Sequence, residues 1–242
     1  MRKTKETEHY IFNYQKGSLA EKDIESIINL QENCYDYICK VLNVRMKRKI
    51  KYFLCESPEE VGRAYGDNEP ANGFAKFPDE IYAVYNEKVK CTGPHEDAHI
   101  ISYNALGNPK QPLLREGLAM FFDEVWFGIP NKAWVKVFIA KNLYKNLSLL
   151  KETKRFYDLP ETITYPESGA FVHYLISVFG IEKFKEFYKT AGSDFDKSFF
   201  ETFGISLNEF EDRMVRYIGN IAYNKSICKT VEDYLKKENL LK

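Results

Sequence analysis

Three residues in the segment GPHEDAHIISY have the types and spacing of a metal site. His95 and His99 are four positions apart, and Glu96 lies between them. On an α-helix, residues four apart lie on one face, about 40° apart around the axis, so both imidazoles can bind one ion. Glu96 is about 100° round the helix from His95, where its carboxylate can act as a general base towards a metal-activated water. The pattern predicts a catalytic metal site, with Zn²⁺ as the ion.

A third ligand is expected from Glu116, near the start of the next predicted helix. The loop between them contains Gly107 and two prolines, which can reverse the chain direction. Two histidines and one carboxylate would leave the fourth position of a tetrahedral zinc ion for water, as in catalytic sites. The alternative interpretation is a helix that carries two ordinary surface or half-buried histidines.

The elements that must position these residues divide the chain into two regions. Residues 1–92 mix strand and helix patterns, whereas residues 93–242 have helical periodicity. Strands are expected at 9–15, 49–55, 73–77 and 81–85, and helices at 18–43 and 57–66. Further helices are expected at 94–106, 111–128 and 130–144. A loop is expected at 159–169, followed by a helix that ends at 180, a helix at 181–192 and a last helix that begins at 206.

These patterns predict an α+β fold. A small mixed α/β lobe with a short sheet, residues 1–92, is expected to pack on a mainly helical lobe, residues 93–242. The helical lobe would carry the His-Glu-x-x-His motif and Glu116. No linker separates the two lobes, so we expect one catalytic domain overall.

The composition bears on partners and compartment. Lys+Arg and Asp+Glu each number 35 and are interspersed, so no basic surface for nucleic acid is expected. No apolar run approaches the roughly 18 residues of a membrane span, and the N-terminal segment MRKTKETEHYIFNYQKGS lacks the apolar core of a signal peptide. Five cysteines without a dense framework are typical of a reducing compartment. We therefore expect a cytoplasmic protein without nucleic-acid or membrane partners.

The segment HEDAH followed by LLREGLAMFF resembles the gluzincin metallopeptidases, the peptidase MA-like group that contains thermolysin-like enzymes and zinc aminopeptidases. Downstream, YPESGAFVHYLISVFGIEKFKEFYK and FETFGISLNEFEDRMVRYI are similar to the C-terminal helices of that group, so the resemblance covers residues 70–220. It implies a zincin-like fold and one zinc ion per chain, bound by His95, His99 and Glu116. It also implies Glu96 as general base and hydrolysis of a peptide or protein substrate.

Two positions depart from the pattern of that group. Asp97 occupies a middle position of the motif, where uncharged residues are usual. It lies about 200° round the helix from His95, off the metal face, and is expected to point to solvent or to cap the first turn. Arg115 precedes Glu116 in a segment where a tryptophan is common, and the sequence assigns it no role.

The resemblance suggests further site residues. Gluzincins use a tyrosine or histidine of the helical lobe to stabilise the oxyanion, which makes Tyr165 the candidate donor and His173 the alternative. They also bind extended substrate on an edge strand beside the metal. The segment Gly73, Phe74 and Ala75 is the corresponding candidate, because its small residues allow close approach.

Two other functions are compatible with the motif. The chain could be a catalytically inactive gluzincin-fold module that keeps its zinc for protein binding or sensing. It could also be a hydrolase that acts on a non-peptide amide or ester at the same site. A zinc-dependent peptidase is the function that the sequence favours.

Overall fold

The computed structural model describes residues 1–241 and contains two compact units, the first spanning Met1–Gly107 and the second beginning at Asn108. Lys242, the last residue of the predicted helical region, lies outside the described residues.

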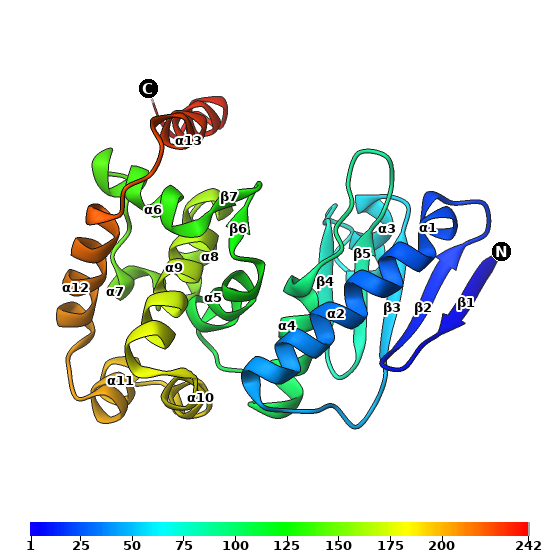
Figure 1. Cartoon of the computed structure of the whole chain (residues 1–242), viewed down its shortest axis with the longest axis horizontal. Helices are drawn as coiled ribbons and strands as arrows, with labels where there is room; N and C mark the ends of the chain where they lie inside the picture. The colour runs from blue at the N-terminus through cyan, green and yellow to red at the C-terminus, as the bar shows by residue number, and fades with distance from the viewer. Residues whose placement is uncertain (242) are drawn as a thin grey trace. The chain divides into compact units, whose positions relative to one another are not determined.

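The first unit is built on a five-stranded mixed sheet of order β1-β2-β3-β5-β4 (Figure 1). Neighbours among β2, β3 and β5 are parallel, whereas β1 on β2 and β4 on β5 are antiparallel. The four strands predicted from the sequence are confirmed. The additional strand β1 is almost wholly polar and exposed, which is why no apolar pattern predicted it. The strands are β1 (Arg2–Glu6), β2 (Tyr10–Gln15), β3 (Ile50–Cys55), β4 (Gly73–Lys76) and β5 (Glu80–Val84).

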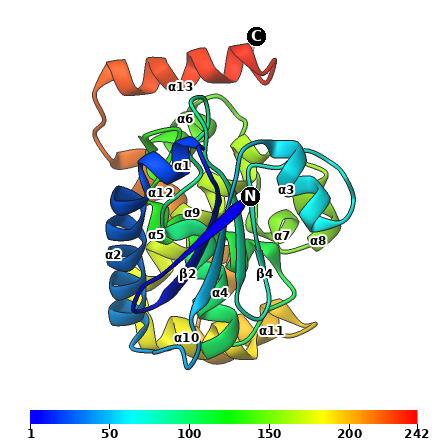
Figure 2. The ribbon, with the colours of Figure 1, turned by 90° about the vertical axis from the view of Figure 1, so that its right-hand side faces the viewer.

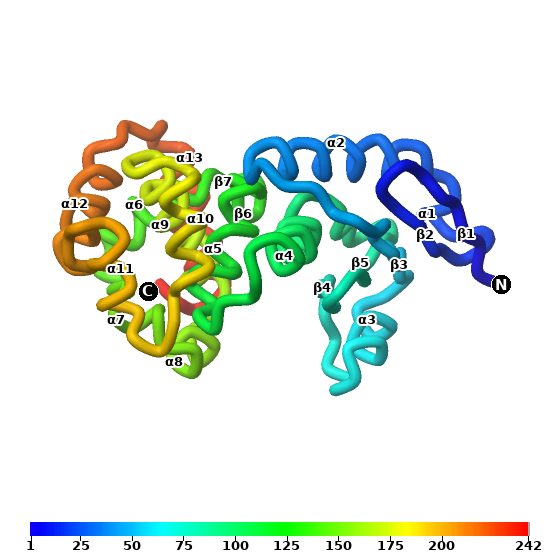
Figure 3. Tube along the Cα trace, turned by 90° about the horizontal axis from the view of Figure 1, so that it is seen from below, coloured from blue at the N-terminus to red at the C-terminus, as the bar shows by residue number. Residues whose placement is uncertain are grey.

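Helices cover both faces of this sheet. α2 (Ile24–Leu42) and α4 (Pro94–Ala105) lie on one face, and α3 (Pro58–Tyr65) lies on the other (Figure 3). The helix predicted over residues 18–43 is interrupted at Asp23, so a short α1 (Leu19–Lys22) precedes α2. Side chains of alternating strand positions are fully or almost fully buried in the unit: Tyr10, Phe12, Tyr52, Leu54, Ile81 and Ala83.

The second unit is mainly helical. α5 (Pro112–Asp123) and α9 (Glu161–Phe179) pack side by side, and α13 (Lys225–Lys237) packs on α6 (Asn131–Ala140) (Figures 1 and 2). The remaining helices are α7 (Leu147–Leu150), α8 (Thr153–Tyr157), α10 (Ile181–Thr190), α11 (Phe195–Phe203) and α12 (Leu207–Asn220).

The end of α5 differs from the prediction. The expected helix over residues 111–128 stops at Asp123, because Glu124 adopts a left-handed conformation with φ 61°. A two-stranded hairpin follows, formed by β6 (Val125–Trp126) and β7 (Ile129–Pro130). The apolar residues of this segment made it resemble a continuation of the helix.

The loop predicted over residues 159–169 is wrong, because α9 already begins at Glu161 and contains Pro166 in its interior. A proline removes one main-chain hydrogen bond and normally disfavours a helix at this point. Here the flanking residues Thr164, Glu167 and Ser168 are buried, so packing within the unit outweighs the local preference.

The predicted fold class is confirmed: a mixed α/β region with a five-stranded sheet is followed by a mainly helical region. The five-stranded sheet ends with β5 at Val84 and α4 begins at Pro94, whereas the compact units divide after Gly107, so the motif helix α4 belongs to the first unit. No helix within residues 1–241 is both long and apolar enough to cross a membrane.

Candidate metal centre

The helix α4 presents the two motif histidines one turn apart. Gly93 precedes it with φ 141°, a conformation that favours glycine, and Pro94 occupies the first helical position. The imidazole rings of His95 and His99 are edge to face, with centroids 5.0 Å apart. His99 is buried and His95 is partly exposed, so one ligand is held in the protein interior and the other is accessible.

Tyr103 fixes the orientation of His99. Its hydroxyl lies 3.1 Å from Nδ1 of His99, one turn earlier on the same helix, and the two rings are stacked at 5.4 Å. With Nδ1 engaged in this hydrogen bond, Nε2 would be the nitrogen that binds a metal. The spacing of four residues was present in the sequence, but the motif alone did not point to Tyr103.

The third expected ligand, Glu116, lies in the first half of α5 and is 8% exposed. Arg115 braces the loop that leads to it. The guanidinium donates to the main-chain oxygens of Pro109 and Lys110 at 3.1 and 3.2 Å, and to the Tyr157 hydroxyl at 3.0 Å. Arg115 therefore holds the start of α5, a role that the sequence did not indicate.

Gly117 sets the distance between α5 and α9. A Cβ at this position would lie 2.6 Å from Cγ2 of Val172 and 2.8 Å from the main-chain oxygen of Ser168. Only glycine permits such close approach without movement of one helix. The glycine that follows Glu116 thus fixes the carboxylate-bearing helix against α9.

His95, His99 and Glu116 form a group that could hold a metal ion. Each residue offers one ligand atom, and these atoms all lie within 4.8 Å of one another. Around a tetrahedral ion with bonds of about 2.1 Å, ligand atoms stand roughly 3.4 Å apart, so small side-chain adjustments close the set. Two imidazoles and one carboxylate are a donor set that transition-metal ions accept. Three protein ligands would leave the fourth position of a tetrahedral ion open.

Glu96 and the candidate substrate strand are neighbours in the first unit. β4 is the last strand of the sheet and pairs only with β5 among the described residues, so its other edge carries no strand. A Cβ on Gly73 would lie 3.1 Å from Oε1 of Glu96. Phe74 instead stacks on Tyr82 of β5, with ring centroids 4.9 Å apart. By strand alternation Ala75 shares the face of Gly73, so the small residues of β4 lie on the side of the motif helix.

The expectation that Asp97 points to solvent or caps the helix is wrong. The residue is 0% exposed, and its Oδ2 accepts from the Tyr10 hydroxyl at 2.8 Å and from Nε2 of Gln31 at 2.7 Å. Burial raises the pKa of the Asp97 carboxyl well above its usual range, while these two hydrogen bonds oppose the shift. Asp97 therefore faces the interior of the first unit, because α4 is covered on that side by α2 and the sheet.

The two candidate oxyanion donors are both on α9. Tyr165 is partly buried, with its ring 5.3 Å from that of Trp126 and 6.3 Å from that of Phe156. His173 lines a cavity of about 320 Å³, where burial and the charge of the neighbouring Lys132 lower its pKa. Tyr165 thus lies on a helix and not in the expected loop, and its catalytic role stays a prediction.

Comparison with protein-family models and with curated proteins found no match to this chain.

Proposed function

We propose that this protein is a zinc-dependent peptidase of the gluzincin type. The observation that carries the proposal is the group of His95, His99 and Glu116, whose ligand atoms lie within 4.8 Å of one another. The donor set and the His-Glu-x-x-His spacing together favour a catalytic ion over a structural one, because structural zinc sites have four protein ligands.

The zinc ion, when bound, would lower the pKa of a water molecule and polarise the scissile carbonyl. Glu96 follows His95 in the motif, and its carboxylate would accept the proton of the attacking water and deliver it to the leaving amine. Tyr165 would donate a hydrogen bond to the developing oxyanion. The reaction is hydrolysis of a peptide bond in a peptide or protein substrate.

The edge of β4 supports a peptide as the substrate. An extended peptide can add to an unpaired strand edge through main-chain hydrogen bonds. Gly73 lies beside the Glu96 carboxylate, so a peptide on this edge would run past the general base. Gly73 has no side chain and Ala75 has a small one, which leaves room for the peptide, whereas Phe74 packs on the other face.

The first test is the zinc content of the purified protein, compared with that of the His99→Ala variant. We expect about one zinc per chain, lost in the variant, because a catalytic site with only two protein ligands binds weakly. Glu96→Gln should keep the zinc and lose turnover of a peptide library by at least about a hundredfold, the usual contribution of a general base. Full activity in Glu96→Gln would overturn the mechanism.

The alternative, an inactive zinc-binding module for protein binding or sensing, is an outcome of the same test. Bound zinc without hydrolysis of peptides by the natural sequence would favour it. Hydrolysis of esters or non-peptide amides alone would favour the third function. We propose a cytoplasmic location, because five cysteines without a dense framework are typical of a reducing compartment. We propose no nucleic-acid or membrane partner, because acidic and basic residues are balanced at 35 each and no apolar run approaches the length of a membrane span.

A further inference from the structure

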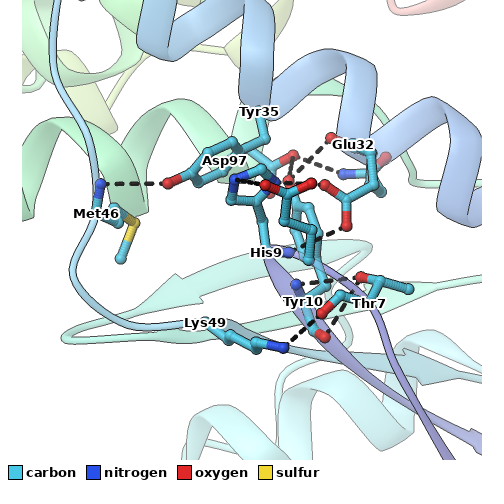
Figure 4. Close-up of polar contacts among 10 residues, drawn as sticks. Thr7, His9, Tyr10, Glu32, Tyr35, Met46, Lys49 and Asp97 are labelled. Atoms are coloured by element: carbon cyan, nitrogen blue, oxygen red, sulfur yellow. Dashed lines mark hydrogen bonds and ion pairs between the residues drawn. The ribbon is translucent and has the colours of Figure 1, made fainter.

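Three polar side chains meet in the interior of the first unit, each 0% exposed: Tyr10 on β2, Gln31 on α2 and Asp97 on α4. Oδ2 of Asp97 accepts from Nε2 of Gln31 at 2.7 Å, and the Tyr10 hydroxyl lies 2.8 Å from the same oxygen. The hydroxyl also lies 3.0 Å from the main-chain oxygen of Gln31. The three side chains thus join a strand and two helices at one point, and Figure 4 shows Tyr10 and Asp97 within this set of polar contacts.

Gln31 also binds the beginning of the motif helix. Its Oε1 accepts from the main-chain nitrogen of Gly93 at 2.9 Å, and its Nε2 donates to the Gly93 oxygen at 3.1 Å. No side chain of α4 itself caps this helix. Gln31 of α2 therefore forms hydrogen bonds both with Gly93, which precedes α4, and with Asp97 in the first turns of α4.

Stability alone gives a poor account of these polar side chains. Burial of a carboxyl is costly, and a well-packed apolar residue is often as stable or more so. Other interior positions of α4, including Ala98, Ile100 and Ile101, are apolar. What hydrogen bonds add is direction: they fix the rotation of a helix about its axis, which apolar contacts restrain only loosely.

Rotation of α4 is what the candidate site depends on. Asp97 directly follows Glu96 and lies two positions from each of His95 and His99. Oε1 of Glu96 lies close to Gly73 on β4: a Cβ added to Gly73 would be only 3.1 Å from this oxygen. Turning the helix by a fraction of one residue step would move the base along the strand and the imidazoles away from a common ion.

We propose that Tyr10, Gln31 and Asp97 form a positioning network, which sets the rotation of α4 about its axis so that its other faces present the histidines and Glu96 correctly. This inference rests on the proposed metal-dependent function. It assigns a role to the acidic residue inside the motif that is distinct from metal binding and from proton transfer.

The test compares two matched substitutions, Tyr10→Phe and Tyr144→Phe. Each removes one hydroxyl that is hydrogen-bonded to a buried carboxyl group: the Tyr10 hydroxyl donates to Asp97 in the first unit, and the Tyr144 hydroxyl donates to Glu211 at 2.8 Å in the second. Both variants should lose similar thermal stability. Only Tyr10→Phe should weaken zinc binding, by roughly tenfold in a chelator competition, the lower end of the range for residues that orient metal ligands.

The conservative variant separates positioning from simple loss of packing. In the part of the chain that the structure describes, Oδ1 of Asp97 has no hydrogen-bond partner, and Oδ2 makes both bonds. Asp97→Asn can therefore keep the acceptor that Tyr10 and Gln31 need. We expect its zinc affinity to exceed that of Asp97→Ala by roughly tenfold.

A second readout needs neither zinc nor substrate. Hydrogen exchange of the α4 amides in metal-free protein should be faster in Tyr10→Phe and unchanged in Tyr144→Phe. Equal zinc affinity and equal α4 exchange in the two variants would overturn the positioning role. If the natural sequence binds zinc but does not cleave peptides, the peptidase proposal fails while this comparison still decides the network. If it binds no zinc, faster α4 exchange would support the network and unchanged exchange would overturn it.

Discussion

At the scale of single residues, the contact between β4 and α4 is controlled by the absence of a side chain. A Cβ on Gly73 would meet Oε1 of Glu96 at 3.1 Å, Sγ of Cys91 at 3.3 Å and the main-chain oxygen of Tyr82 at 3.3 Å. The main-chain oxygen is part of the sheet and cannot give way easily, so the carboxylate would have to move. The position of the candidate base thus depends on a glycine in the neighbouring strand.

Gly73→Ala should therefore lower kcat for peptide hydrolysis by roughly tenfold or more, because a small displacement of a catalytic group is costly. The zinc content should stay at that of the natural sequence, since the substitution does not touch the three candidate ligands. Steady-state kinetics and elemental analysis of the same preparation check both parts.

The control for this variant is Gly219→Ala on α12. A Cβ there meets nothing within 4 Å, and the helical position favours alanine. Unchanged kinetics in Gly219→Ala with reduced kcat in Gly73→Ala is the expected pair of results. Equal kinetics in the two variants would contradict a role for Gly73 in placing Glu96.

The sequence predicted the candidate ligands because their relation is mostly local. Four-residue spacing on one helix fixes the face that His95 and His99 share, and Glu116 follows after one short loop. The environment of Asp97 was not predictable in the same way. Its partners Tyr10 and Gln31 are 87 and 66 residues away in the chain, so helical geometry gave the direction of the side chain and not what covers it.

At the scale of elements, local patterns predicted strands and helices except where packing opposes local preference. Pro166 suggested a loop, but α9 is buried on most sides and continues through it. The residues around it include a carboxyl: Glu167 is 1% exposed and accepts from the main-chain nitrogen of Lys145 through both oxygens. A helix position beside a proline thus anchors the loop between α6 and α7.

Glu167 should make the stability of the protein depend on pH. Burial raises the pKa of its carboxyl well above the usual 4.5. Between pH 4.5 and the raised pKa, the folded state holds a proton that the unfolded chain has released. The free energy of unfolding therefore falls as pH rises through this window. Glu167→Gln keeps an acceptor for Lys145 but has no carboxyl to titrate. The free energy of unfolding of this variant, relative to that of the natural sequence, should therefore rise from pH 5 to pH 8.

Urea denaturation of Glu167→Gln and of the natural sequence at several pH values in this range checks the prediction. Parallel curves for Glu167→Gln and the natural sequence would mean that Glu167 does not titrate differently on unfolding.

At the scale of the whole molecule, the fold class was predictable because the change from strand to helix periodicity is sustained over many residues. The division into compact units was less predictable, because α4 has the periodicity of a helix but packs with the sheet of the first unit. Periodicity does not predict which element a helix packs against, and the packing partners of α4 determine the surroundings of the motif.

A metal that binds only the folded chain must also stabilise it. At a free zinc concentration one hundred times the dissociation constant, binding adds about 2.7 kcal/mol to the free energy of unfolding. For a chain of 242 residues, this corresponds to a rise in Tm of roughly 5 to 10 °C. Removal of the metal with a chelator should lower the Tm of the natural sequence by this amount, and added zinc should restore it. Magnesium should not, because it prefers oxygen ligands to imidazole.

His99→Ala gives the matched comparison for the thermal experiment. It removes one member of the group formed with His95 and Glu116, so its Tm should be insensitive to both chelator and zinc. Because His99 is buried, the absolute Tm of the variant also reflects lost packing, and only the change in Tm on adding metal is informative. A zinc-dependent rise of the same size in the variant would place the stabilising ion elsewhere in the molecule and would remove the main support for the candidate site.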